Sequence, residues 1–411
     1  MNDSGTPREF DIVVWGATGF TGTLVAEYLL RQYGTDRALR WAIAGRSQEK
    51  LDGLRDTLGV APDELQTIVA DSFDADSLTD LANRTRVVLT TVGPYALYGS
   101  ALVEACVESG THYCDLAGEV QWIRKIIDQH HQRAQETGAR IVHCCGFDSV
   151  PMDIGVWFLQ DKAKQKYDHY CRSITMLVKA TKGTASGGTI ASVMNILQES
   201  RADRSVARIL VDPYSLNPEG ERDGPDRRDQ QRTLYREDAN SWTAPFVMAM
   251  VNTKVVRRSH ALLGFPYGKD FRYQEAVMTG TGIAGRLKGI AMTAAIGAFM
   301  AGGSFSLTRK VLQIFVPDPG EGPDRELQQS GFFNLMQIGE LPDGTVLKTR
   351  ITGDQDPGYG STSKMLSECA VCLAKDELDS PGGVLTPAAA MARPLLERLQ
   401  TNAGLTFELR D

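Results

Sequence analysis

Three glycines at three-residue spacing near the start of the chain are the residues whose chemistry is easiest to interpret. Gly16, Gly19 and Gly22 form a G-x-x-G-x-x-G pattern directly after the apolar run 12–15. Such glycines permit a sharp turn after a strand, let backbone amides approach a diphosphate closely, and let the next helix pack against the strand. The positive end of that helix points at the diphosphate. The pattern therefore predicts a dinucleotide-binding turn, and a purely structural turn is the alternative.

Further contacts with a dinucleotide are expected along this turn and at the ends of later strands. Asp71 follows the strand-like run 66–70, where its carboxylate can accept a hydrogen bond from the adenine amino group; a turn cap is the alternative. Val92, Gly93 and Pro94 follow another strand-like run and line the crevice at the strand ends. The expected contacts are Gly16, Thr18, Gly19, Phe20, Thr21, Gly22, Asp71, Val92, Gly93 and Pro94.

The residue type after the second predicted strand decides which dinucleotide fits. The run 39–44 ends in Gly45, Arg46 and Ser47, with Lys50 one turn further along. NAD sites usually carry an acidic residue here, which accepts hydrogen bonds from the ribose hydroxyl groups. A guanidinium group instead pairs strongly with a ribose 2′-phosphate. Arg46 and Ser47 therefore predict NADP(H) as the cofactor, and an Arg46 that caps the loop and stacks on adenine is the alternative.

Candidates for proton transfer are few. The cofactor carries the hydride, so the protein positions the nicotinamide and supplies a proton. Tyr95 and Tyr98 are phenols that can donate to an enolate, and neither has a lysine three or four residues further on. His143, Cys145 and Asp148 follow a predicted strand on the expected ligand side. We take Tyr95, Tyr98 and Asp148 as catalytic candidates, with a structural turn at Asp148, apolar packing of the cysteines and proton delivery by water as the alternatives.

The elements that must hold these residues alternate between strand and helix. This rhythm predicts a doubly wound parallel sheet of the Rossmann type. The expected strands are 12–15, 39–44, 66–70, 86–91, 112–116 and 139–143, and the expected helices include 23–33, 100–109 and 120–137. The predicted fold class is α/β. An NADP-binding Rossmann domain (8–150) is followed by an inserted second α/β (α+β) domain (151–355) and by C-terminal helices (356–411) that return to the first domain.

The second half of the chain carries weaker signals. The predicted strands there are 173–180, 246–251 and 271–278, followed by a hairpin of 332–339 and 346–352 around Pro342-Asp343-Gly344. The polar stretch 213–242 is expected to be a long surface loop. Arg257 and Arg258 are expected on a solvated face, and binding of a carrier phosphate is the alternative.

Composition and charge exclude several classes of protein. The 411 residues are 42% hydrophobic and 23% charged, which is the profile of a globular chain. The net charge of −7 leaves no basic surplus for binding nucleic acid. The seven cysteines lack the spacing of zinc sites, so no metal is expected and a reducing cytoplasm is favoured. The polar N-terminus does not resemble a secretory signal.

One apolar stretch raises the question of membrane contact. Residues 289–302 are fewer than the roughly 20 that a spanning helix needs, so no transmembrane span is expected. A buried core helix is the preferred interpretation. A helix that lies against a lipid-like ligand or a bilayer surface is the alternative, and it would make a cytoplasmic protein peripherally membrane-associated.

Several motifs together resemble a known family. They are GATGFTG, AGRS, TTVGPYALYG, GTHYCDLAGE, CGFDSVPMD, SGGT and GVLTPAAA. This set is similar to the saccharopine dehydrogenase-like oxidoreductases, above all to the bacterial trans-acting enoyl reductases, from Phe10 to about Phe407. The resemblance implies an NADP-binding Rossmann domain and a second α/β domain. It also implies reduction of a carbon–carbon double bond on a lipid-like or polyketide acyl chain, which a separate polyketide or fatty-acid synthase carries.

Two other functions are compatible with these residues. An amino-acid-linked dehydrogenase, as the wider family name suggests, needs arginine and acidic residues facing the nicotinamide, and the sequence reveals no such cluster. A non-catalytic NADP-binding scaffold would keep the glycine turn and Arg46 but would lack a substrate cavity beside Tyr95. An NADPH-dependent reductase of acyl or lipid-like substrates is favoured over both.

Overall fold

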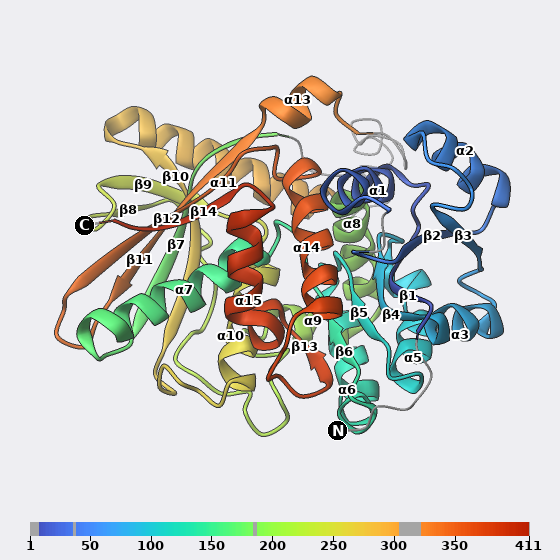
Figure 1. Cartoon of the computed structure of the whole chain (residues 1–411). Coiled ribbons are helices and arrows are strands. Elements are labelled where there is room, and N and C mark those ends of the chain that lie inside the picture. The colour runs from blue at the N-terminus through green and yellow to red at the C-terminus, as the bar shows by residue number, and fades with distance from the viewer. Residues whose placement is uncertain (1–7, 36–37, 184–186, 304–321, 411) are drawn as a thin grey trace.

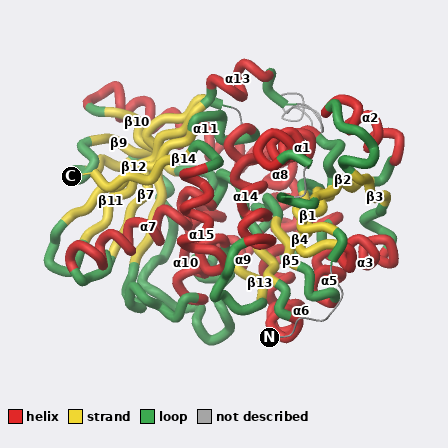
Figure 2. Tube along the Cα trace, in the orientation of Figure 1, coloured by secondary structure: helices red, strands yellow, loops and turns green. Residues whose placement is uncertain are grey.

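The computed structural model describes residues 8–35, 38–183, 187–303 and 322–410. Within these residues the chain forms two seven-stranded sheets with a layer of helices between them (Figure 1 and Figure 2). The first sheet has the order β13-β6-β5-β4-β1-β2-β3, and its neighbouring strands run parallel. Its strands are β1 (Phe10–Trp15), β2 (Trp41–Gly45), β3 (Gln66–Val69), β4 (Thr85–Thr90), β5 (His112–Cys114), β6 (Arg140–Val142) and β13 (Gly383–Leu385).

β1 lies at the centre of the first sheet and is buried on both faces. Ile12 and Val14 pack in the core cluster that contains Leu29, whereas Val13 and Trp15 pack in the cluster on the opposite face. The strand order reverses between β1 and β4, and ligands of such sheets bind outside the carboxyl ends of the strands at this point. The helices around the sheet are α1 (Phe20–Tyr33), α2 (Gln48–Leu58), α3 (Ala75–Arg84), α4 (Tyr95–Tyr98), α5 (Ser100–Glu108), α6 (Val120–Thr137) and α14 (Gly360–Lys375).

The second sheet is mixed and has the order β14-β12-β11-β7-β10-β9-β8. β7 and β10 pair in parallel, and the other pairs are antiparallel. Its strands are β7 (Ser173–Lys182), β8 (Leu234–Arg236), β9 (Ser241–Pro245), β10 (Arg272–Gly280), β11 (Phe332–Glu340), β12 (Val346–Gly353) and β14 (Leu405–Arg410). The predicted hairpin is confirmed, because β11 and β12 pair around a turn in which Gly344 has a φ of +88°.

A layer of helices joins the two sheets. Figure 1 shows α7, α10, α14 and α15 between them, and α7 packs against both α10 and α15. After β12 the chain returns to the first sheet, where α14 packs on α1 and β13 pairs with β6, before β14 joins the second sheet. The remaining helices are α7 (Val150–Tyr167), α8 (Gly187–Ala202), α9 (Arg204–Val211), α10 (Ala249–Leu262), α11 (Gly282–Gly303), α13 (Arg325–Ser330) and α15 (Pro387–Thr401).

The expected strand at 246–251 is wrong. β9 ends at Pro245, and α10 begins at Ala249 with almost all of its side chains buried. A buried strand and a buried helix can both contain a short apolar run. Six residues are too few for the periodicity to show which of the two elements they form.

Arg257 and Arg258 do not lie on a solvated face. Both are on α10 and are nearly inaccessible to solvent. Arg257 Nε donates to Asp226 at 2.9 Å, and Arg258 donates to two backbone carbonyl groups. These bonds fasten parts of the polar stretch 213–242 to the helix layer, so that stretch is not a free surface loop. Neither guanidinium group is available for a carrier phosphate.

The apolar stretch near residue 290 is not a core helix. It forms α11, the one helix in the described residues that is long and apolar enough to cross a membrane by length and composition. Only 11% of its most apolar window is buried. The preferred sequence interpretation therefore fails, because apolar composition alone does not reveal whether another element covers a helix.

Candidate functional site

The glycine turn after β1 has the shape of a diphosphate cradle. Gly16 has a φ of +84°, which favours glycine, and a Cβ atom on it would lie 2.5 Å from Cγ2 of Val92. A Cβ atom on Gly22 would lie 2.1 Å from the carbonyl oxygen of Gly16. No side-chain hydrogen bond caps the start of α1 at Gly19. The free amide end of a helix beside a bare backbone turn fits the diphosphate of a dinucleotide.

The other predicted residues of the turn lie around this cradle. Thr18 is exposed, and its hydroxyl group lies close to Gly45 at the end of β2. A Cβ atom built on Gly45 would lie 3.8 Å from Thr18 Oγ1. Thr21 is half-buried in the first turn of α1. The ring of Phe20 packs edge-on against Tyr359, with centroids 4.8 Å apart, so Phe20 joins α1 to the start of α14.

The predicted cofactor-selecting residues follow β2 on the same side. Arg46 is exposed, and no side-chain hydrogen bond or ion pair engages it within the described residues. The Ser47 hydroxyl accepts from the Lys50 amide at 3.3 Å and thereby caps α2. The Asp71 carboxylate accepts from the Phe73 amide at 2.9 Å, which is the turn-capping role that the sequence left as an alternative.

The segment after β4 abuts the glycine turn. Thr91 Oγ1 donates to the carbonyl group of Gly16 at 3.2 Å, and Val92 follows directly. The next residues are held by Glu119, whose carboxylate accepts from the Tyr95 and Ala96 amides at 2.7 and 3.0 Å. Burial raises the pKa of Glu119 above its usual value. Glu119 was not among the predicted site residues. The one sequence feature that could have indicated it is its place as the last residue of the motif GTHYCDLAGE.

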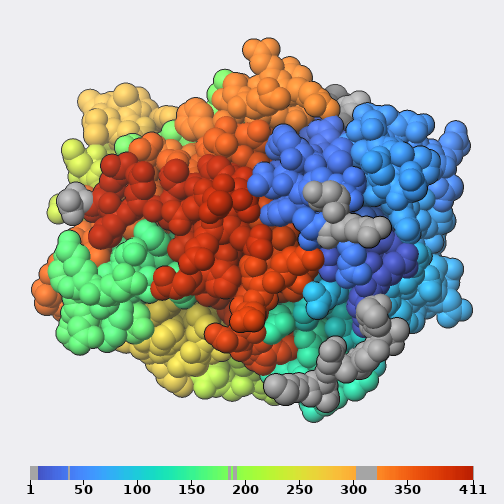
Figure 3. All heavy atoms as spheres, viewed as in Figure 1, coloured from blue at the N-terminus to red at the C-terminus, as the bar shows by residue number. Residues whose placement is uncertain are grey.

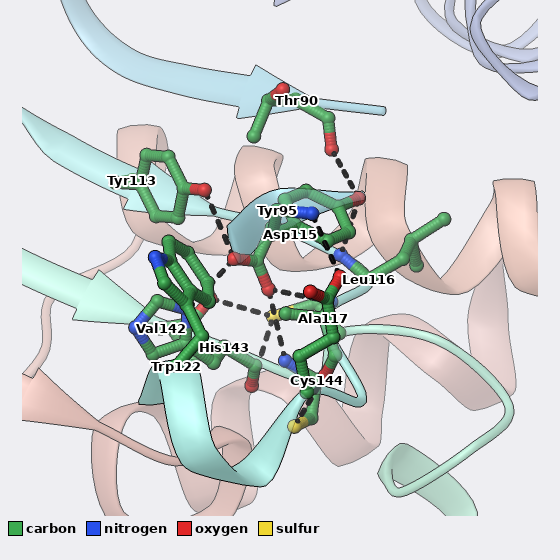
Figure 4. Close-up of polar contacts among 12 residues, drawn as sticks. Thr90, Tyr95, Tyr113, Asp115, Leu116, Ala117, Trp122, Val142, His143 and Cys144 are labelled. Carbon is green, nitrogen blue, oxygen red and sulfur yellow. Dashed lines mark hydrogen bonds and ion pairs between the residues drawn. The ribbon is translucent and has the colours of Figure 1, made fainter. Parts of the chain in front are cut away.

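Tyr95 and Tyr98 occupy different environments. Tyr95 is buried, and its hydroxyl group donates to the Thr90 carbonyl at 3.3 Å and accepts from the Leu116 amide at 3.2 Å (Figure 4). Burial raises the pKa of Tyr95 well above its usual value. Tyr98 is half-exposed and packs edge-on against Phe73, with centroids 5.8 Å apart. The Tyr95 hydroxyl thus joins the ends of two strands, and only Tyr98 keeps an accessible ring.

A buried polar cluster holds the ends of β5 and β6 together. Asp115 accepts from Tyr113 Oη at 2.9 Å and from the Ala117 amide at 2.9 Å, and its carboxylate lies 2.7 Å from His143 Nδ1 (Figure 4). The Cys144 amide completes the set at 3.2 Å. His143 is 2% exposed, so its ring is a buried structural partner of Asp115. Sequence reasoning did not single out Asp115.

Asp148 differs from the other candidates because its carboxyl group is left free. It is partly exposed, and no hydrogen bond to it occurs within the described residues. Burial alone raises its pKa to about 7. Its loop is rigidly held: the Phe147 amide donates to Thr362 Oγ1 at 3.0 Å, and Ser149 Oγ donates to Asn252 Oδ1 at 3.0 Å. The loop follows β6, so Asp148 lies at the carboxyl ends of the strands, with a carboxyl group whose pKa burial raises toward neutral pH.

Comparison with known proteins defines the class. Residues 12–142 match the family model of the saccharopine dehydrogenase NADP-binding domain, so the chain is an NADP-dependent oxidoreductase whose first sheet binds NADP(H). A solved structure of apo saccharopine dehydrogenase from Saccharomyces cerevisiae superposes with a TM-score of 0.52 and 12% identity. The match covers 97% of this chain and 99% of that chain, and it establishes the shared α/β fold.

Curated relatives narrow the class to one family. A Mycobacterium tuberculosis protein provisionally named trans-acting enoyl reductase is 40% identical over 98% of both chains. The trans-acting enoyl reductase of Mycobacterium leprae is 38% identical over 97% of both chains. That of Mycobacterium ulcerans is 37% identical over 96% of this chain and 97% of its own. The chain therefore belongs to the saccharopine dehydrogenase-like oxidoreductases, in the branch of trans-acting enoyl reductases.

Proposed function

We propose that this protein uses NADPH to reduce a carbon–carbon double bond of a lipid-like or polyketide acyl chain, with Asp148 as the proton donor. The observation that carries the proposal is the Asp148 carboxyl group at the end of β6, which is half-buried and has no hydrogen-bond partner among the described residues, and whose pKa burial raises to about 7. A general acid works best when its pKa lies near the working pH. The relatives' name supports enoyl reduction as the reaction.

The glycine turn and Arg46 are proposed to bind different parts of the cofactor. The cradle of Gly16 and Gly22, with the uncapped start of α1, would hold the diphosphate. Arg46, free and exposed after β2, would pair with the ribose 2′-phosphate, which an acidic residue would repel. Val92, Gly93 and Pro94 would contact the nicotinamide half, and Glu119 holds the residues that follow them at the start of α4.

The chemistry is divided between the cofactor and the chain. When bound, NADPH would supply a hydride for the β-carbon of a double bond conjugated to a thioester. Negative charge then develops on the α-carbon and the carbonyl oxygen. The protonated Asp148 donates to the α-carbon and is left as a carboxylate, which solvent can reprotonate because the residue is partly exposed. Tyr98 stays a second candidate donor, whereas the Tyr95 hydroxyl is engaged by backbone groups.

The substrate is proposed to arrive on a carrier. The term trans-acting in the relatives' names supports a reductase that serves a separate polyketide or fatty-acid synthase. An amino-acid substrate is less well supported, because Arg257 and Arg258 are buried in structural contacts. A cytoplasmic location fits the seven buried free cysteines and the supply of NADPH.

The test compares the wild type with Asp148→Asn on 2-enoyl thioesters. The loss of NADPH absorbance gives the rate, and mass spectrometry identifies the saturated product. We expect Asp148→Asn to lower kcat about 10²- to 10⁴-fold while the Kd for NADPH stays unchanged. Wild-type kcat falls as the pH rises through about 7, where Asp148 loses its proton. Asp63→Asn, an exposed acid, is the control. An unchanged kcat in Asp148→Asn rejects the donor, and no turnover of any enoyl thioester rejects the reaction.

A further inference from the structure

α11 presents an unusual surface for a globular chain. Its outward side chains form a stripe at helical spacing: Ile283 is 80% exposed, Leu287 is 61% exposed and Ile290 is 47% exposed. Figure 1 shows the helix on the side of the second sheet away from α7 and α15, and Figure 3 shows atoms of this part of the chain at the rim of the molecule. Single exposed apolar residues are ordinary, but a contiguous exposed stripe on one helix marks a surface that another phase or molecule covers.

The opposite side of α11 is fixed to the protein. A Cβ atom on Gly285 would lie 2.3 Å from the carbonyl oxygen of Gly280, and one on Gly289 would lie 2.6 Å from Thr233 Cγ2. One turn later, the Thr293 hydroxyl lies 3.0 Å from that of Thr233. The small residues on one side let the helix backbone approach the second sheet closely. These contacts pack α11 along β9 and β10 of the second sheet.

The charges on α11 have one sign. The segment 276–303 contains no acidic residue, whereas Arg286 and Lys288 lie within the exposed part of the helix, in a chain of net charge −7. The guanidinium group of Arg286 lies 5.3 Å above the ring of Trp242, and Tyr235 beside it is 46% exposed. Cationic side chains with Trp and Tyr at the edge of an apolar helix match the interface of a bilayer with anionic headgroups.

We propose that α11 is a docking surface for an anionic lipid bilayer, on which the helix lies in the plane of the interface. Its apolar stripe inserts among the acyl chains, and Arg286 and Lys288 contact the phosphate groups of the lipids. A second copy of the chain fits this surface less well, because its α11 would bring two more cations and no acid to pair with them. The inference is independent of the proposed reaction, because vesicle binding is measured without turnover.

The test is flotation of the purified full chain with vesicles of phosphatidylcholine alone or mixed with phosphatidylglycerol. We expect binding to the mixed vesicles. The triple variant Ile283→Ser, Leu287→Ser, Ile290→Ser should partition at least about tenfold less, because the transfer of each aliphatic side chain is lost. Arg286→Gln with Lys288→Gln should bind both vesicle types equally. Val211→Ser, which removes a 71% exposed apolar side chain from α9, is the matched control and should bind as the wild type does.

Three outcomes overturn the proposal. One is failure of the wild type to float with either vesicle. Another is flotation that the triple serine variant retains in full. The third is a dimer in light scattering that the triple variant dissociates, which would assign α11 to a second copy. NADPH binding and thermal unfolding of each variant show that the fold is intact, so a loss of flotation is assigned to the helix surface.

Discussion

The Glu119 carboxylate accepts a hydrogen bond from the backbone amide of Tyr95 at 2.7 Å. A side chain that follows β5 thus holds the start of α4, the helix that follows β4. The same carboxylate accepts from Ala96, and Ser192 Oγ of α8 donates to it at 3.1 Å. Glu119 thus connects the segment beside the glycine turn to a helix outside the first sheet. A buried acceptor with three donors is costly to alter, because each donor left unpaired loses its hydrogen bond and stays desolvated.

We expect Glu119→Gln to destabilise the protein and to weaken NADPH binding. A glutamine keeps one acceptor oxygen, which can still accept from Tyr95, but its NH2 group then faces the Ala96 amide, so one hydrogen bond is lost, at a cost of about 1–3 kcal/mol in the free energy of unfolding. Urea unfolding and titration with NADPH measure the two effects. Glu136→Gln, on the exposed end of α6, is the control and should change neither. Equal stability and equal Kd would show that Glu119 does not organise the cofactor segment.

Arg46→Asp should weaken the binding of NADPH about 100-fold or more while leaving NADH nearly unaffected, because a charge-assisted contact with the 2′-phosphate becomes a repulsion. Cofactor fluorescence during titration with each dinucleotide measures both constants. Arg208→Asp is the control, because it changes the net charge by the same amount at an exposed position of α9. If affinity for both dinucleotides falls equally, Arg46 does not select the phosphate.

Gly22→Ala should abolish NADPH binding and lower stability by about 1–3 kcal/mol, because the new methyl group has no room beside the Gly16 carbonyl. Gly53→Ala is a matched control in α2, where a Cβ atom meets nothing within 4 Å. There the change should stabilise the helix by about 0.5–1 kcal/mol. Thermal unfolding and NADPH titration of both variants make the comparison. Normal binding by Gly22→Ala would contradict the close approach of turn and helix.

Asp148→Asn should raise the melting temperature more at pH 8 than at pH 5. The folded-state pKa of Asp148 is raised from 3.8 to about 7, so the folded protein binds the proton more tightly than the unfolded chain does. Stability is therefore lost as the pH rises through about 7, and an asparagine removes that loss. Scanning calorimetry of the wild type, Asp148→Asn and Asp63→Asn at the two pH values checks the sign. If Asp148→Asn raised the melting temperature equally at pH 5 and pH 8, ionisation of Asp148 would not be the cause of the stabilisation.

Local patterns predicted the first sheet and its glycine turn because each depends on residues close together in sequence. The run around Val13 is buried on both faces, and Gly22 meets a group only six residues away. The contacts of Asp115 with His143 and of Glu119 with Tyr95 were not predicted, because the partners lie 28 and 24 residues away and nothing in the intervening sequence encodes the contact. Arg257 was misjudged for the same reason, since Asp226 is 31 residues distant.

The sheet that binds the cofactor is completed by late parts of the chain. β13 adds the edge strand beside β6, and α14 packs beside α1 on one face of the sheet, over β1, β4 and β5. A ribosome that has released only the first 350 residues would therefore expose a sheet that lacks its edge strand and part of the cover of one apolar face. Truncation after β6 would not yield a stand-alone nucleotide-binding module, and synthesis must run almost to its end before the first domain can close.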